Sequence, residues 1–71
     1  MKAYCDKEEI KKQLDSRPLT YLITEMGKLG IKLSYESLGH IIAGRNSCKV
    51  DYALAMAQIL NTTVERLFYL K

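Results

Sequence analysis

The sequence has no tryptophan, one proline, two cysteines and no long apolar stretch. No apolar run approaches the ~18 residues of a membrane-spanning helix, and the opening MKAYCDKEEI lacks the apolar core of a signal peptide. We therefore expect a soluble, cytoplasmic protein without membrane contact. With 48% hydrophobic and 27% charged residues, the composition is typical of a globular chain. At 71 residues we expect one domain, residues 1–71, of marginal stability.

Cysteine and histidine are too few for a disulfide framework or a metal site. Cys5 and Cys48 are the only cysteines, His40 is the only histidine, and no CxxC pair is present. Small secreted domains usually carry four or more cysteines, so two isolated ones indicate a reducing compartment. A metal site needs three or four ligands at short spacings. We expect Cys5 and Cys48 to be small, partly buried side chains, and we expect no metal and no cofactor.

The sequence also lacks the residue groups that catalysis requires. It has no acid pair, no nucleophile beside a base and no glycine-rich loop that could hold a phosphate. We therefore predict that the protein is not an enzyme, and we expect no small-molecule ligand.

Apolar residues at helical spacing run through the chain, with no alternating strand pattern and no repeat. Asp6 with Glu9 predicts the capping box of a first helix, which the stretch around Pro18 ends. A second helix is predicted over residues 18–29 and a third over residues 34–43, with Ser34 as its N-cap.

A fourth helix is predicted over residues 50–60, and Thr62 with Glu65 predicts the capping box of a fifth. The fold class expected is all-α, with five helices and no sheet. The predicted core consists of Leu22, Ile23, Met26, Leu38, Ile41, Leu54, Leu60, Leu67 and Phe68, and Val50, Ala57 and Val64 are also expected to face inward.

Glycines mark two predicted helix ends and two positions inside helices. Gly30 and Gly44 are expected to close the second and third helices in the left-handed conformation. Gly27 costs its helix about 1 kcal/mol relative to alanine, and close approach by the next helix would compensate. Gly39 would let the third helix lie close to DNA or to the second helix.

Positive charge gathers around the third predicted helix. Residues 27–49 hold four lysine or arginine residues against Glu36 alone, a net +3 that equals the charge of the whole chain. The first two turns of this helix carry short or hydrogen-bonding side chains. A helix that reads base edges in the major groove must bury one side in its own domain and offer such groups on the other. Two helices joined by a short turn, the second polar outside, match the helix-turn-helix layout.

SYESLGHIIAG, residues 34–44, resembles the recognition-helix pattern S-x-x-T-[IV]-S-x-[IYW]-x-x-G of the Cro and phage-repressor (XRE-type) helix-turn-helix family. The next stretch, GRNSCKVDYALAMAQILNTTVERLF, resembles that family's glycine, basic loop and l-x-x-l-x-x-i-A-x-x-L ending. The likeness has no gap between Leu38 and Phe68, whereas one additional residue precedes Ser34. The resemblance implies a five-helix Cro/phage-repressor-like domain and a sequence-specific DNA-binding transcriptional regulator, a small repressor acting on a palindromic operator.

The resemblance and the polar face together suggest roles for single residues. Glu36 either accepts a hydrogen bond from cytosine or only stabilises the helix N-terminus, and His40 either contacts DNA or faces solvent. The base-contacting residues expected are Ser34, Tyr35, Glu36, Ser37 and His40. The phosphate-contacting residues expected are Lys32, Arg45, Asn46 and Lys49.

Two apolar residues at the end of the chain suggest self-association. Tyr69 and Leu70 lie beyond the predicted buried pair, so they either form part of a homodimer interface or cover the first helix. The partners expected are double-stranded DNA and a second copy of the chain. The alternative is a protein-interaction module of the antitoxin or antirepressor type, which keeps the fold without binding an operator and has no need of the basic loop.

Overall fold

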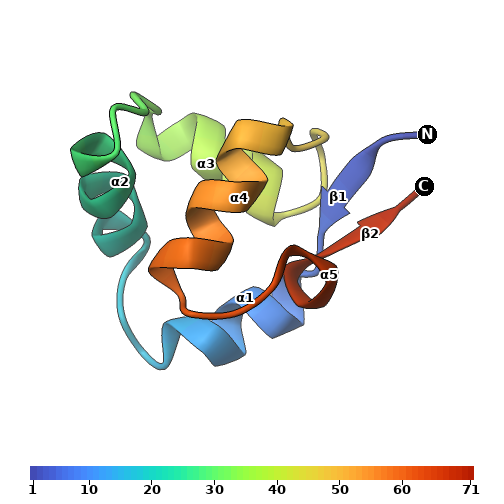
Figure 1. Ribbon diagram of the computed structural model, residues 1–71, viewed down its shortest axis with the longest axis horizontal. Helices are drawn as coiled ribbons and strands as arrows, with labels where there is room; N and C mark the ends of the chain where they lie inside the picture. Colours follow the sequence, from blue (N-terminus) through green and yellow to red (C-terminus); the bar gives the residue numbers. More distant parts are fainter.

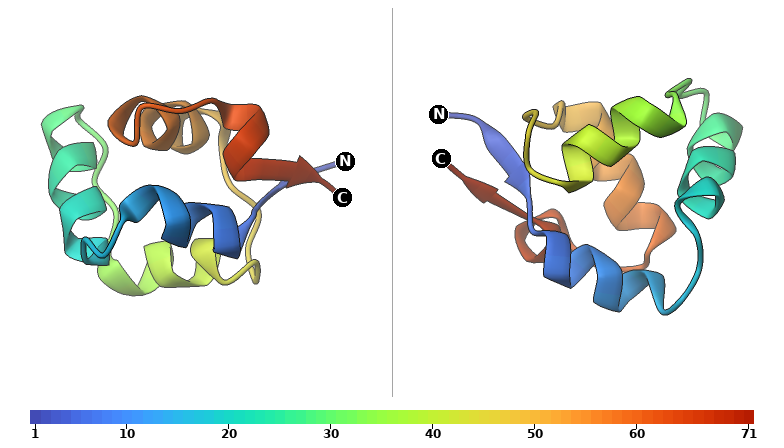
Figure 2. Two further views of the ribbon diagram at one scale, coloured as in Figure 1. Left: turned by 90° about the horizontal axis from the view of Figure 1, so that it is seen from below. Right: turned by 180° about the vertical axis from the view of Figure 1, so that it is seen from behind.

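The computed structural model describes all 71 residues and contains five helices and a two-stranded antiparallel sheet. In chain order the elements are β1 (Ala3–Cys5), α1 (Lys7–Leu14), α2 (Leu19–Lys28), α3 (Tyr35–Ile42), α4 (Val50–Ile59), α5 (Val64–Leu67) and β2 (Phe68–Leu70). Helix α4 lies in front of α3 in Figure 1, and the two strands project together at one side of the helices. Seen from behind, α3 lies across the front of the molecule (Figure 2). None of the helices combines the length and the apolar character that crossing a bilayer requires.

The predicted starts of α1 and α3 are confirmed, because both N-cap side chains accept a hydrogen bond from the helix. The capping box predicted for α1 forms only in part, since the Asp6 backbone N–H donates to Leu67 O at 2.7 Å and not to Glu9. Asp6 Oδ1 accepts from the Glu9 backbone N–H at 3.3 Å. Ser34 Oγ accepts from the Ser37 backbone N–H at 3.0 Å. Each bond satisfies a backbone donor that has no partner inside its own helix.

Three helices end in the same way, with one residue in the left-handed conformation. Gly30, Gly44 and Asn61 have φ values of 85°, 80° and 55° after α2, α3 and α4. In each case the next residue returns its N–H to a carbonyl five positions back, which is the Schellman arrangement. These bonds are Ile31 N to Met26 O at 3.0 Å, Arg45 N to His40 O at 3.0 Å and Thr62 N to Ala57 O at 2.9 Å.

The capping box predicted for the last helix is wrong. Thr62 already closes α4, so the N-cap position of α5 falls to Thr63, whose side chain makes no capping hydrogen bond. The last helix is also short, since it ends at Leu67 and Phe68 begins β2.

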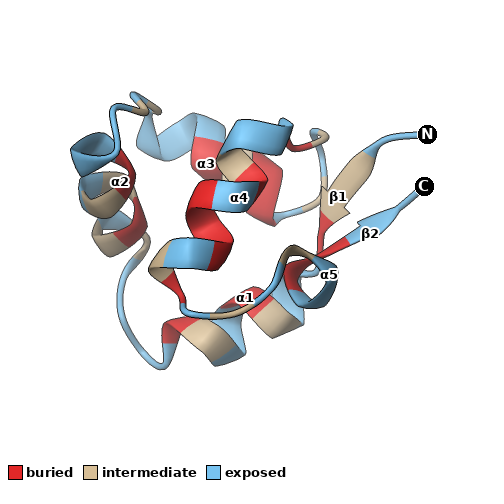
Figure 3. Ribbon diagram, viewed as in Figure 1, coloured by how far each residue is buried: buried red, intermediate tan, exposed pale blue.

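One core holds the helices and the sheet together, and Figure 3 shows its buried residues on every surrounding element. Of the predicted core, Ile23 is only half-buried and Leu54 is exposed, whereas the other seven residues are buried. Burying one large apolar side chain contributes about 1.5–3 kcal/mol. The largest side chains with less than 2% exposure are Ile10, Leu22, Met26, Leu38, Met56 and Leu67.

Helix α4 faces inward with a different set of residues from the one predicted. Val50 and Leu54 are 74% and 58% exposed. The side that meets the core carries Ala53, Met56 and Ala57, which follow the helical spacing i, i+3 and i+4. Small side chains on this side allow α4 to pack close to α2 and α5.

The expected absence of a sheet is wrong, because the two ends of the chain pair with each other. Ala3 pairs with Leu70, Tyr4 with Tyr69 and Cys5 with Phe68. The pairing extends by one residue on each strand, where Lys2 and Lys71 exchange backbone hydrogen bonds of 3.1 and 2.9 Å. The fold is therefore mostly helical with a small sheet.

Both cysteines are buried and free, in agreement with their predicted role as small packed side chains. The Cys48 backbone N–H donates to Ala3 O at 2.8 Å, which ties the loop before α4 to β1. Burial raises the pKa of the Cys5 thiol to about 12, with smaller effects from Cys48 and Asp6. Burial likewise raises the pKa of Cys48 to about 11, helped by the charge of Asp51. Both thiols are therefore neutral near pH 7.

Candidate nucleic-acid interface

Helix α3 buries one side in the core and leaves the other side open to solvent. Leu38, Ile41 and Ile42 are buried, as predicted, and they lie on the side opposite Glu36 and His40. Because three apolar side chains anchor one side of this short helix, the orientation of its polar side is fixed. Figure 2 shows that no other element covers α3 when the molecule is seen from behind.

The connection between α2 and α3 runs over six residues, from Leu29 to Ser34. This is longer than the three- to four-residue turn of a helix-turn-helix unit and includes the additional residue before Ser34. Helices α2 and α3 nevertheless pack against each other. Gly27 does not serve this packing as expected, because a Cβ at that position would meet no atom within 4 Å.

Two serines at the start of α3 form a local hydrogen-bonded pair. Besides the capping bond, Ser34 Oγ lies 2.9 Å from Ser37 Oγ. Both side chains are exposed. When Ser34 donates to Ser37, the Ser37 hydroxyl proton is free to donate outward. The pair therefore presents one oriented hydroxyl donor at the N-terminal end of α3.

Tyr35 and Glu36 complete the exposed first turn of α3. The Tyr35 side chain is 59% exposed although most of its atoms are apolar, so burial in this chain does not explain its position. The Glu36 carboxylate also lies near the positive end of the helix dipole, which stabilises it there. The second role predicted for Glu36 therefore has a physical basis in the chain alone.

His40 connects Glu36 to Arg45 along the open side of α3. Arg45 Nη1 lies 3.4 Å from His40 Nδ1, and His40 Nε2 lies 3.8 Å from Glu36 Oε1. A guanidinium can only donate, so Nδ1 accepts and a neutral imidazole carries its proton on Nε2, facing the carboxylate. His40 is only half-buried, so both of its predicted roles stay open. The three side chains form one polar row.

The cations around α3 differ in how far they are already neutralised. Lys28 Nζ lies 2.8 Å from Glu25 Oε2, and this hydrogen bond raises the pKa of the lysine. Lys32 and Lys49 are exposed and have no carboxylate within ion-pair distance, and Asn46 is exposed as well. Lys49 Nζ lies 5.8 Å from the centre of the Tyr52 ring. The structure thus places all four predicted phosphate-contacting residues on the surface before and after α3.

An exposed polar helix face flanked by cations is a surface suited to a polyanion. No protein-family model, curated protein or solved structure matches the chain.

The predicted dimer residues lie on a strand. Tyr69 and Leu70 belong to β2 and are 48% and 67% exposed. The Tyr69 ring lies 6.3 Å from the ring of Tyr4, its partner on β1. Strand β2 pairs with β1 on one side, and no strand pairs with its other edge.

Sequence reasoning missed two exposed groups of residues. Val50 and Leu54 lie one turn apart on the open side of α4, where an apolar pattern had predicted burial. Lys7 and Lys11 lie one turn apart on α1, on the side nearest the end of α3. Only the three-dimensional arrangement of α1 and α3 reveals the second group. No group of three or more potential metal ligands is present.

Proposed function

We propose that the protein is a sequence-specific DNA-binding regulator that inserts α3 into the major groove. The observation that carries the proposal is the exposed first turn of α3, where Ser34, Tyr35, Glu36 and Ser37 all face solvent on a helix anchored by its opposite side. Their hydroxyl and carboxylate groups are of the kind that discriminate bases in the major groove. His40 extends this row by one turn.

Charge supports the same proposal. Lys32 precedes α3 in the chain, Arg45 follows it, and Lys49 and Asn46 lie in the next loop. When a duplex docks on α3, cations before and after the helix reach phosphates on either side of the groove. Such interactions fix the position of the helix and supply affinity for any sequence.

We further propose that the DNA-bound form is a homodimer. One α3 helix contacts few base pairs, and a two-fold dimer reads two half-sites about 34 Å apart. Tyr69 and Leu70 are exposed apolar residues on β2, whose outer edge has no strand partner. Pairing of β2 with its counterpart in a second copy removes the open edge and covers part of each side chain, one on either face of the enlarged sheet.

The experiment is a binding titration with DNA at several salt concentrations, after selection of a preferred site from a random pool of duplexes of roughly 20 base pairs. Tyr35→Ala and Ser37→Ala are each expected to reduce the preference for the selected site by about 1–3 kcal/mol, the range for one base-specific interaction. Arg45→Ala and Lys49→Ala are expected to weaken all sequences about equally. Each lowers the slope of log K against log salt by roughly one unit.

Lys12→Ala is the matched control for the charge variants, since Lys12 is exposed on α1 and lies outside the stretch from Lys32 to Lys49. It is expected to leave both slope and preference unchanged. Sequence preference that survives Tyr35→Ala and Ser37→Ala, together with unchanged slopes for Arg45→Ala and Lys49→Ala, is the result that excludes α3 as the reading helix. One chain per selected site in sedimentation excludes the dimer.

One observation favours the alternative of a protein-interaction module. Val50 and Leu54 form an exposed apolar pair on α4, and such surfaces often bind other proteins. A chain of this kind gives no selected DNA site, and Val50→Lys or Leu54→Lys removes its partner binding without changing its fold.

A further inference from the structure

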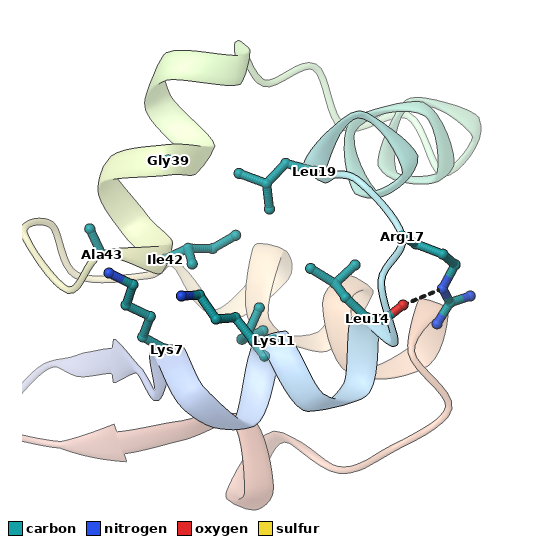
Figure 4. Close-up of a pocket in the computed structure, with 9 residues that line it drawn as sticks. Lys7, Lys11, Leu14, Arg17, Leu19, Gly39, Ile42 and Ala43 are labelled. Atoms are coloured by element: carbon teal, nitrogen blue, oxygen red, sulfur yellow. Dashed lines mark hydrogen bonds between the residues drawn. The ribbon is translucent and has the colours of Figure 1, made fainter.

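A pocket lies between α1, the start of α2 and the second half of α3. Its volume is about 320 Å³. Helices α1 and α3 form its two walls, and Leu19 at the start of α2 lies at one end, as Figure 4 shows. The inner surface is apolar, formed by Ile10, Leu14, Leu19, Ile42 and Ala43.

The charged residues of the pocket are all positive. Lys7, Lys11 and Arg17 line it, and no acidic side chain does. Figure 4 shows the Lys7 and Lys11 side chains directed from α1 toward the end of α3. Arg17 turns away to the end of α1, where its Nε donates to Leu14 O at 2.8 Å and its Nη2 to Gln13 O at 3.0 Å. Two ammonium groups, those of Lys7 and Lys11, therefore remain at the pocket.

These two ammonium groups have no anionic partner within the chain. The ion pairs of the structure are Lys28 with Glu25 and His40 with Glu36, and neither includes Lys7 or Lys11. The carbonyl groups at the end of α3 attract cations in general. Two of them, those of His40 and Ile41, already accept hydrogen bonds from Arg45 and Gly44. An anion between the two lysines thus meets two ammonium groups that no carboxylate of the chain neutralises.

Gly39 keeps the pocket open on the side of α3. It lies in the middle of the helix, where glycine is less favourable than alanine because it loses more backbone freedom on folding. A Cβ at this position would meet no atom within 4 Å, so packing against α2, one of its two expected roles, does not require the glycine. Gly39 is instead one of the residues that line the pocket. Any larger side chain there would project toward this space.

We propose that the pocket binds a small amphiphilic anion, a carboxylate with an aliphatic body. At about 30 Å³ for each water-sized group, the pocket holds roughly ten non-hydrogen atoms, which is the size of octanoate. The aliphatic body replaces water against Ile10, Leu14 and Ile42, and the carboxylate lies between Lys7 and Lys11. This proposal departs from the expectation that the protein has no small-molecule ligand, and it is independent of DNA binding.

The experiment is a titration of the full chain with octanoate, followed residue by residue by nuclear magnetic resonance. We expect shifts confined to the methyl groups of Ile10, Leu14, Leu19 and Ile42, with a dissociation constant on the order of 1 mM. Acetate, which has the charge without the body, is expected to cause no such shifts. Octan-1-ol, which has the body without the charge, is expected to bind more weakly.

Two sets of variants test the two parts of the pocket. Lys7→Gln and Lys11→Gln are each expected to weaken octanoate binding by about two- to fivefold, and Lys12→Gln not at all. Gly39→Leu fills the pocket and is expected to abolish binding. Gly27→Leu is its matched control, because Gly27 is also inside a helix and also has open space around it, but lies outside the pocket.

Three results would overturn the proposal. The first is an absence of shifts at octanoate concentrations about tenfold above the expected constant. The second is equal binding of octan-1-ol and octanoate with no effect of the lysine variants, since the charge then has no role. The third is self-association of the chain that Gly39→Leu abolishes, because the occupant of the pocket is then a second copy.

Discussion

The inward side of α4 can be tested by comparing two of its residues that lie two positions apart. Met56 has 0% of its side chain exposed, whereas Leu54 is 58% exposed. We expect Met56→Ala to lower the free energy of unfolding by about 2–5 kcal/mol, the range for truncating a large buried side chain. Leu54→Ala is expected to change it by about 0.5 kcal/mol or less, because the side chain already meets water.

These magnitudes are large for so small a domain. At about 0.05–0.15 kcal/mol per residue, a chain of 71 residues has a total stability of roughly 4–11 kcal/mol. Urea unfolding followed by far-ultraviolet circular dichroism measures both variants. For Met56→Ala we expect a lower urea midpoint and an unchanged slope of the free energy of unfolding against urea concentration. Met56→Leu conserves volume and is the control, at a cost below about 1.5 kcal/mol. If Leu54→Ala costs as much as Met56→Ala, Leu54 is buried in solution and α4 is rotated the other way.

Two further predictions concern the start of α3 and the buried thiols. Ser34→Ala removes the capping bond of 3.0 Å and is expected to lower the free energy of unfolding by about 1 kcal/mol. The melting temperature then falls by about 4–8 °C, whether or not DNA is present. An unchanged melting curve would show that the cap contributes nothing. The thiols of Cys5 and Cys48 ionise with a pKa of 9.0 in the unfolded chain but of about 12 and about 11 when folded. Their contribution to the free energy of unfolding is therefore fully present below pH 9 and is lost as the pH rises through the folded values. Urea midpoints measured from neutral to alkaline pH test this, and a double Cys5→Ala, Cys48→Ala variant that falls as steeply as the natural chain would assign the loss to other groups.

Most helix ends could be predicted because each depends on residues within one turn of the chain. The hydroxyl of Ser34 and the carboxylate of Asp6 cap helices that begin one residue later. Gly30 and Gly44 adopt the left-handed conformation that favours glycine. These features are local, so the sequence alone contains the information they need.

The rotation of α4 and the sheet could not be predicted in the same way. Alanine is nearly neutral in hydropathy, so Ala53 and Ala57 indicated burial more weakly than Val50 and Leu54, although small residues suit a helix with close neighbours on several sides. The strands have three residues each, too few for an alternating pattern, and their partners lie at opposite ends of the chain.

The candidate site likewise has a part that could be predicted from the sequence and a part that could not. The exposure of Ser34, Tyr35, Glu36 and Ser37 was predicted, because the N-cap and the apolar stripe of α3 together determine which side faces solvent. The polar row of Glu36, His40 and Arg45 lies within α3 and the residues just after it, so it also depends on local structure. The pocket beside Lys7 and Lys11 was not predicted, because it requires the placement of α1 against α3.

The pairing of β1 with β2 has a consequence for the order of folding. Pairing of Tyr4 with Tyr69 closes a loop that contains almost the whole chain, whereas the helices and their caps require only short loops. The entropy cost of closure grows with loop length, and interactions between distant residues form slowly. We infer that the helices assemble first and that the ends join last. By the same reasoning the ends are the first part to separate, so their amide hydrogens exchange with solvent faster than those of Leu38 and Met56 in the core.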